Sequence, residues 1–230
     1  MASDALVTNG ISRRFGHREA LRSLTMAVRS GEIYGFLGPN GAGKTTAIRC
    51  ILGLIQMDAG TVSIFGDQDP VNRLKSVGTM VETPAFHGFM TGHENLLLAA
   101  AYGGLSPDHI APAIEAVGLA ERAKERVETY SLGMRQRLGL ARAIMGSPRL
   151  LILDEPTNGM DPRGMKDVRD LLLGLAEQGT TILVSSHLLS EVQQFCTRVG
   201  ILDDGVLVHE GTIGDDLESV YLSVTQRGIQ

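Results

Sequence analysis

The sequence has 230 residues, and 43% of them are hydrophobic. That is enough for one domain, or one domain with an inserted lobe, to bury a substantial core, and it argues against two full domains. The net charge of −5 and the lack of a basic patch beyond Arg13 and Arg14 argue against a DNA or RNA partner. The opening residues lack the basic and apolar regions of a signal peptide, and every apolar run falls short of about 18 residues. We therefore expect a cytosolic chain that does not itself cross a membrane.

Two or three strands are predicted at the start of the chain, because apolar and polar residues alternate through residues 5–28. The alternation is clearest at Leu24, Met26 and Val28. Hairpins in this segment would form an antiparallel layer.

A phosphate-binding loop follows the strand predicted for residues 33–37, because residues 38–46 fit G-x-x-x-x-G-K-[ST]. The glycines allow backbone turns in which successive N–H groups point at phosphate oxygens. Lys44 would meet the β- and γ-phosphates, and Thr45 would place a hydroxyl on a magnesium ion where a helix opens. An ordinary glycine-rich turn is the alternative reading, and the loop alone indicates only a nucleoside triphosphate. The predicted ligands in this loop are Gly38, Asn40, Gly41, Ala42, Gly43, Lys44, Thr45 and Thr46.

The remaining pattern predicts an α/β core that is interrupted by helices. Strand signals disappear between residues 84 and 148, where a capping box at Thr91 and Glu94 and an N-cap at Ser106 mark helix starts. We therefore predict one domain over residues 1–230, with a core in residues 1–84 and 149–230 and a helical lobe in residues 85–148. The predicted core elements are a helix over 45–54, strands over 61–65, 76–82, 150–153, 180–185, 199–202 and 206–210, and a helix over 213–222.

Two carboxylates, Asp154 and Glu155, follow the apolar strand predicted for residues 150–153. Parallel strands end at one edge of a sheet, so these side chains should meet the phosphate loop there. Asp154 is suited to bind the magnesium ion, and Glu155 is suited to act on the attacking water. Neighbouring side chains on a strand face opposite ways, which favours two separate roles. The alternative is a solvated acidic turn.

The stretch from Tyr130 to Leu138 completes a set of motifs that resembles the ATP-binding subunit of an ABC transporter over nearly the whole chain. The resemblance implies a P-loop NTPase (RecA-like) core of α/β class with an N-terminal antiparallel β layer and an inserted helical lobe. It also implies that Ser131 and the backbone of Gly133, in the signature motif, reach the γ-phosphate of ATP bound by a second cassette. A head-to-tail dimer, expected to be a homodimer, would then hold two ATP molecules.

Three further positions match the family one by one. The resemblance implies that Phe15 stacks on adenine and that His187 contacts the γ-phosphate, whereas an ordinary core phenylalanine and a core or surface histidine are the alternatives. Asp161 falls in the loop that crosses the dimer interface in this family, and it can also cap the helix before Pro162. The two cysteines, Cys50 and Cys196, show no ligand spacing and are predicted to be buried free thiols in a reducing compartment.

Three positions depart from the common pattern of the family. Glu82 stands where most members carry glutamine, and an ionised glutamate only accepts hydrogen bonds, so we expect it to reach phosphate only through the metal or water. Leu132 and Met134 replace a glycine and a glutamine in the signature motif. These departures are similar to the subfamily that exports bacitracin, lantibiotics and related drugs.

The predicted function is therefore MgATP hydrolysis that drives a separate membrane permease, with Lys44, Glu155 and His187 as catalytic residues. The predicted metal ligands are Thr45, Asp154 and Glu82. Residues 83–89, which begin at Thr83 and end at Phe89, are predicted to contact the permease, which would hold the chain at the inner face of the cell membrane. A non-hydrolysing regulatory subunit and a soluble ABC ATPase acting on nucleic acid or the ribosome are the alternatives. The transported substrate is not predicted, because in this family it contacts the permease.

Overall fold

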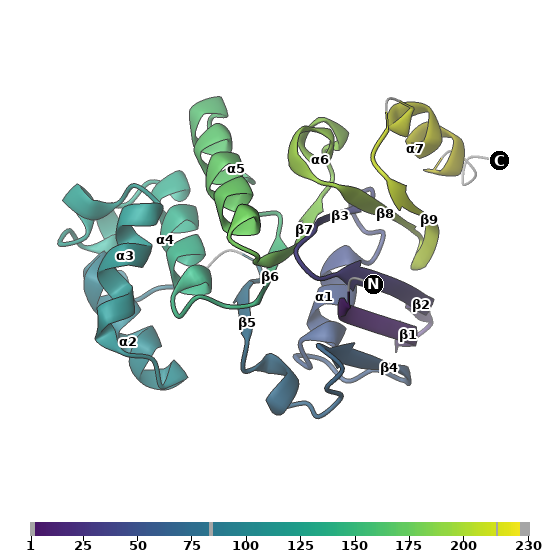
Figure 1. Ribbon diagram of the computed structural model, residues 1–230, viewed down its shortest axis with the longest axis horizontal. Coiled ribbons are helices and arrows are strands. Elements are labelled where there is room, and N and C mark those ends of the chain that lie inside the picture. The colour runs from purple at the N-terminus through teal and green to yellow at the C-terminus, as the bar shows by residue number, and fades with distance from the viewer. Residues whose placement is uncertain (1–2, 83–84, 215, 226–230) are drawn as a thin grey trace.

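The computed structural model describes residues 3–82, 85–214 and 216–225 (Figure 1). Two sheets and the helices packed against them form the α/β arrangement expected of a P-loop NTPase, which confirms the predicted fold class. In the part of the chain that the structure describes, no helix combines the length and apolar character needed to cross a membrane.

A six-stranded sheet forms the centre of the molecule, with strand order β5-β6-β7-β3-β8-β9. All neighbouring strands in it are parallel except β8 and β9, which are antiparallel. Its strands are β3 (Ile33–Leu37), β5 (Val77–Met80), β6 (Leu150–Asp154), β7 (Thr181–Ser186), β8 (Arg198–Asp203) and β9 (Val206–Thr212).

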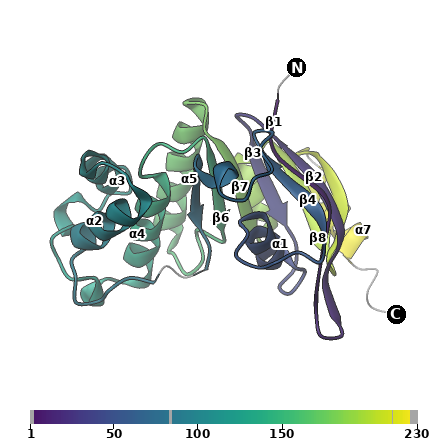
Figure 2. The same cartoon turned by 90° about the horizontal axis from the view of Figure 1, so that it is seen from below.

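The predicted antiparallel layer is present as a three-stranded sheet with order β2-β1-β4. The first segment supplies two long strands, β1 (Asp4–Phe15) and β2 (Arg18–Arg29). The third strand, β4 (Ala59–Ile64), follows the phosphate loop and returns to pair with β1. Figure 2 shows this sheet beside α1 (Lys44–Ile51), on the side away from α2 to α4.

Helices cover both faces of the six-stranded sheet (Figure 1). Tyr34 and Phe36 of β3 pack with α1 and the antiparallel layer, whereas Ile33 and Leu37 pack with the helices on the opposite face. This division follows from the alternation of side chains along a strand. The helices of the second face are α5 (Pro162–Glu177), α6 (Leu189–Phe195) and α7 (Leu217–Thr225).

Three helices lie along the chain between β5 and β6, as the predicted helical insertion requires: α2 (Gly92–Gly103), α3 (Ile110–Ala116) and α4 (Leu132–Ile144). The capping box predicted at α2 is present, because Thr91 Oγ1 accepts from Glu94 N at 3.1 Å and a Glu94 oxygen accepts from Thr91 N at 2.7 Å. The exact boundaries of the lobe at residues 84 and 148 stay a prediction.

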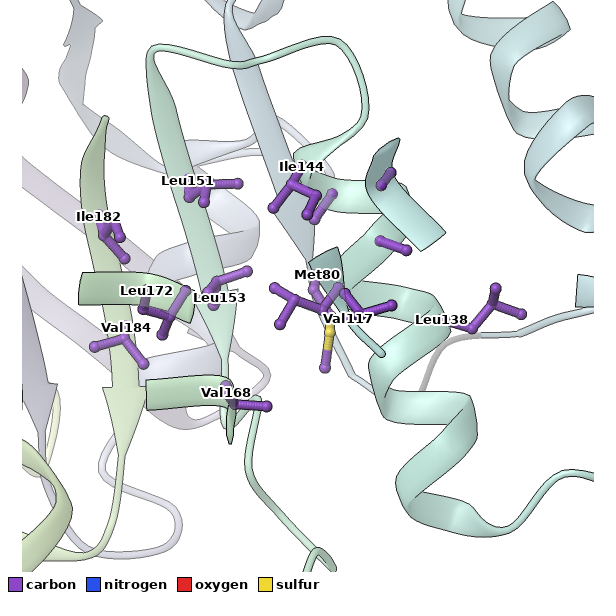
Figure 3. Packing of buried hydrophobic residues seen from close by; sticks show 14 of the residues in the cluster. Met80, Val117, Leu138, Ile144, Leu151, Leu153, Val168, Leu172, Ile182 and Val184 are labelled. Carbon is purple, nitrogen blue, oxygen red and sulfur yellow. The ribbon is translucent and has the colours of Figure 1, made fainter. Parts of the chain in front are cut away.

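The lobe packs onto the central sheet through a shared apolar cluster (Figure 3). Leu138 of α4 belongs to it together with Met80 of β5, Leu153 of β6 and Leu172 of α5, and each of these side chains is buried. Burial of one such side chain contributes about 1.5–3 kcal/mol, so the cluster holds the start of α4 in a defined place beside the carboxyl ends of the strands.

The predicted boundaries of two helices are wrong, and one of these helices, α7, also ends at Thr225 rather than Leu222. Helix α1 ends at Ile51 rather than Leu54, because Gly53 takes a positive φ of 71° and donates its N–H to the carbonyl of Cys50 at 3.0 Å. Helix α7 begins at Leu217 rather than Ile213, because β9 extends to Thr212 and Ile213 N bonds to the carbonyl of Thr197.

Candidate nucleotide-binding site

The carboxyl ends of β3, β6 and β7 bring the predicted motifs to one edge of the sheet. The phosphate loop leaves β3, Asp154 ends β6, and His187 directly follows β7. Thr45 Oγ1 donates a hydrogen bond to Asp154 Oδ2 at 2.7 Å, which joins the first turn of α1 to the end of β6.

The glycines of the phosphate loop occupy places that a side chain would obstruct. A Cβ at Gly38 would overlap the carbonyl oxygen of Leu202, and one at Gly43, where φ is 109°, would lie 2.5 Å from the carbonyl oxygen of Ala20. The loop can therefore follow this path only with glycine at both positions.

Lys44 is turned into the loop and is only 5% exposed. Its Nζ donates to the carbonyl oxygens of Gly38 at 2.7 Å and Pro39 at 3.2 Å. Burial lowers the pKa of Lys44, while the nearby carboxylates of Glu155 and Asp154 act in the opposite direction. A desolvated cation held between carbonyls and carboxylates is well placed to exchange those contacts for phosphate oxygens.

Both carboxylate oxygens of Asp154 are hydrogen-bonded. In addition to the contact with Thr45, Ser185 Oγ of β7 donates to Asp154 Oδ1 at 2.5 Å. The same serine oxygen accepts the backbone N–H of Glu155 at 3.0 Å. Ser185 therefore fixes the orientation of the first carboxylate and the path of the backbone at the second.

Glu155 lies between Lys44 and His187. Its Oε1 is 3.7 Å from Lys44 Nζ, and its Oε2 is 3.2 Å from His187 Nδ1. The residue has a φ of 48°, a left-handed conformation that turns the chain away from the strand direction. The predicted separation of roles is consistent with this geometry, since Asp154 faces Thr45 and Glu155 faces the lysine and the histidine.

A pocket of about 350 Å³ lies over the phosphate loop and is lined by both Phe15 and Glu155. Phe15 is 47% exposed, and the guanidinium of Arg13, which does not line the pocket, lies 4.7 Å from the centre of its ring. Arg18 lines the pocket and donates to the carbonyl oxygen of Gly41 at 2.9 Å. An exposed aromatic ring beside a phosphate loop suits stacking on a nucleobase. The full lining is Phe15, Arg18, Ala20, Asn40, Gly41, Gly43, Lys44, Thr45, Thr46 and Glu155.

The signature motif lines a different pocket, of about 500 Å³, which shares no lining residue with the pocket over the phosphate loop. Ser131 is the exposed N-cap of α4 and accepts from Met134 N at 3.2 Å. Asp161 caps α5 by accepting from Gly164 N at 2.7 Å. Gly133 also lines this pocket, and a Cβ there would meet open space.

Glu82 contacts a residue that was not predicted for the site. Its carboxylate forms an ion pair with Arg49 of α1, and its φ is 61°. Thr83 and Pro84, the first residues of the predicted permease contact, lie outside the described residues. In the described remainder, Phe86 lies under the guanidinium of Arg142 and Phe89 is 69% exposed.

The side chains at this edge fit a magnesium ion bound together with nucleotide. Thr45 and Asp154 offer a hydroxyl and a carboxylate 2.7 Å apart, and Mg²⁺ commonly binds through one or two carboxylates plus phosphate oxygens. Within residues 3–82, 85–214 and 216–225, no group of three or more histidine, cysteine, aspartate or glutamate side chains is arranged to hold a metal ion by itself.

Four residues of the site were missed by the sequence analysis. Ser185 is a polar residue near the end of a buried strand, which is a signal that could have found it. Arg49 stands one helical turn after Thr45, a spacing that places both on one face of α1. The other two, Arg13 and Arg18, lie near Phe15 in the sequence. Only the structure shows Arg18 in the pocket lining, where β1 pairs with β2, and Arg13 beside the Phe15 ring.

Comparison with known proteins agrees with this geometry. The family described as ABC transporter matches residues 21–158. The chain is 46% identical to the uncharacterized ABC transporter ATP-binding protein YdbJ of Bacillus subtilis (strain 168), over 91% of this chain and 70% of that protein. It is 45% identical to the bacitracin transport ATP-binding protein BcrA of Bacillus licheniformis, over 90% of this chain and 70% of that protein.

A solved structure described as the ATP binding subunit of an ABC transporter has a TM-score of 0.86 and 28% identity, covering 96% of this chain and 99% of that one. The resemblance predicted from the motifs is thereby confirmed, and the chain belongs to the ABC transporter family, as an ATP-binding subunit of its transport ATPases.

Proposed function

We propose that two copies of this chain bind MgATP between them, hydrolyse it, and thereby drive a separate membrane permease. The observation that supports hydrolysis most strongly is the position of Glu155 between Lys44 and His187, beside the pair of Thr45 and Asp154. A subunit that only bound nucleotide would not need a carboxylate held in this way.

Binding and charge neutralisation account for most of the catalysis in phosphoryl transfer. Lys44 releases the carbonyls of Gly38 and Pro39 and neutralises charge on the β- and γ-phosphates. Thr45 and Asp154 would hold the magnesium ion, which supplies further charge neutralisation on the phosphates.

Glu155 accepts the proton of the attacking water, and His187 holds both Glu155 and the γ-phosphate in place. Ser185 Oγ accepts a hydrogen bond from the backbone N–H of Glu155, which fixes the backbone that carries the Glu155 carboxylate. Phe15 stacks on the adenine, with Arg13 behind the ring.

The proposal of a head-to-tail dimer is supported by the separation of the two pockets. The signature residues Ser131 and Gly133 line a pocket that contains none of the phosphate-loop residues of the same chain. A second copy turned head to tail would place its Ser131 against the γ-phosphate of the ATP bound by this chain. The same arrangement would complete the other site. Asp161 lies at the same pocket, where it would face the partner.

We further propose that the permease exports a drug, peptide antibiotic or lipid-like molecule. The permease would hold this chain at the inner face of the cell membrane. The support is the 45% identity to a bacitracin transport ATP-binding protein. Residues 83–89 would contact the permease, for which the exposed ring of Phe89 is suited. Glu82, which precedes this segment, would report the nucleotide state to it.

Phosphate release by the purified chain tests the enzymatic part of the proposal. Wild-type protein with MgATP should release phosphate steadily, and removal of magnesium with EDTA should stop the release. Binding of ATP without any phosphate release would instead identify a regulatory subunit.

A further inference from the structure

Leu132, at the start of α4, lies against the backbone of Gly159 in the loop before α5. A Cβ placed on Gly159 would overlap Cδ2 of Leu132 and would lie 3.4 Å from its Cγ. Gly159 also has a φ of 75°, which favours glycine. The leucine and the absence of a side chain at position 159 are therefore sterically matched.

This contact joins the start of α4 to the loop before α5, and the two segments have different predicted roles. Leu132 directly follows Ser131, whereas Gly159 belongs to the turn that starts at Glu155. In that turn, Asn158 N donates to the carbonyl of Glu155 at 3.1 Å, and Met160 N donates to the carbonyl of Thr157 at 3.1 Å. The two residues that flank Gly159 are thus tied by backbone hydrogen bonds to Glu155 and Thr157.

A small pocket also lies between the pocket over the phosphate loop and the signature pocket. A pocket of about 140 Å³ is lined by Glu155, Gly159 and His187. It shares Glu155 with the pocket over the phosphate loop and Gly159 with the signature pocket, so it lies between the two. Leu132 and Gly159 are both exposed at the surface that the partner would cover.

We propose that Leu132 is a positioning residue that couples the two ATP sites of the dimer through its contact with Gly159. This inference rests on the proposed dimer. When Ser131 closes on the partner's γ-phosphate, Leu132 moves with it and sets the position of Gly159, and hence of this chain's own Glu155. ATP bound at one site then changes ATP hydrolysis at the other site, which means that a coupling free energy links the two sites.

The test measures ATP hydrolysis against ATP concentration for a set of matched variants. Leu132→Ala removes the contact, Leu132→Met keeps most of it, and Gly159→Ala forces the leucine away. Gly179→Ala is the control for backbone strain, because Gly179 has a φ of 94° and a Cβ there would meet nothing within 4 Å. The melting temperature of each variant is measured in parallel.

Wild type, Leu132→Met and Gly179→Ala should show positive cooperativity, with a Hill coefficient clearly above 1. Leu132→Ala and Gly159→Ala should lower it to about 1, and the double variant should match Leu132→Ala alone, because the overlap is already relieved. If Gly159→Ala does not fold, the difference between Leu132→Ala and Leu132→Met decides the question.

The proposal is overturned if wild type hydrolyses ATP without cooperativity, or if Leu132→Ala keeps the wild-type Hill coefficient. Independent, multiplicative effects of Leu132→Ala and Gly159→Ala would also overturn it, since they would show no communication through the contact. Failure of the proposed function has a different appearance, because the wild-type chain itself would then release no phosphate.

Discussion

Thr45 and Asp154 are joined by a hydrogen bond of 2.7 Å, although they are 109 positions apart in the sequence. The bond links the helix after the phosphate loop to the end of β6 and marks the place where a magnesium ion would bind. Asp154 also accepts a hydrogen bond from Ser185, so two strands of the central sheet, β6 and β7, and helix α1 converge on one carboxylate.

Ser185→Ala should destabilise the protein and slow hydrolysis. Ser185 is fully buried, and its hydroxyl serves both Asp154 and the backbone of Glu155. Loss of a buried hydrogen bond to a charged acceptor costs about 2 kcal/mol, or about 5 °C in melting temperature for a chain of this size. Thermal unfolding checks the value, with the exposed Ser223→Ala as control; an unchanged melting temperature would contradict the role of Ser185.

Lys44→Ala should weaken ATP binding by about 10³-fold. The estimate comes from a Coulomb energy of about 4 kcal/mol for two charges 4 Å apart at an effective dielectric constant near 20. Titration with a fluorescent ATP analogue measures it. The matched control is Lys166→Ala, which removes an exposed lysine paired with Asp170. Equal affinities in the two variants would show that Lys44 does not contact phosphate.

Glu155→Gln should abolish phosphate release while ATP affinity stays close to wild type. Glutamine keeps the shape of the side chain but cannot accept the proton of the attacking water. The measurement pairs steady-state phosphate release with ATP titration, and Glu177→Gln, an exposed substitution at the end of α5, is the control. Full ATPase activity in Glu155→Gln would remove Glu155 from the role of base.

Glu82→Gln should preserve nucleotide binding and alter mainly the coupling to transport. The ion pair between Glu82 and Arg49 is exposed, so its loss changes stability by about 0–1 kcal/mol. ATP affinity and transport are compared in one preparation of the chain with its permease. A collapse of ATP binding would show instead that Glu82 is an essential ligand of the nucleotide.

The two cysteines should be unreactive in the folded protein. Burial raises the pKa of Cys50 to about 11, so about one Cys50 thiol in a thousand is ionised at pH 8, and burial raises the pKa of Cys196 further. Labelling with a thiol reagent at pH 8 should therefore require denaturant. Rapid labelling of the native chain would contradict the buried positions of Cys50 and Cys196.

The strongest local patterns predicted the fold and much of the site. The phosphate loop, the strand before Asp154 and the capping box at Thr91 each depend on neighbouring residues, and the structure contains all three. The pairing of β4 with β1 depends on contacts between distant segments and could not be predicted from the local pattern. The same reason explains why the contacts of Ser185 and Arg49 were missed.

The central claim is that two copies close around ATP, and the molecular mass of Glu155→Gln in solution tests it most directly. Light scattering after size exclusion should give about 49 kDa, twice the chain mass of 24.6 kDa, with saturating MgATP, and the single-chain mass without nucleotide. A mass of 24.6 kDa at saturating MgATP, with ATP binding confirmed in the same sample, would contradict the account.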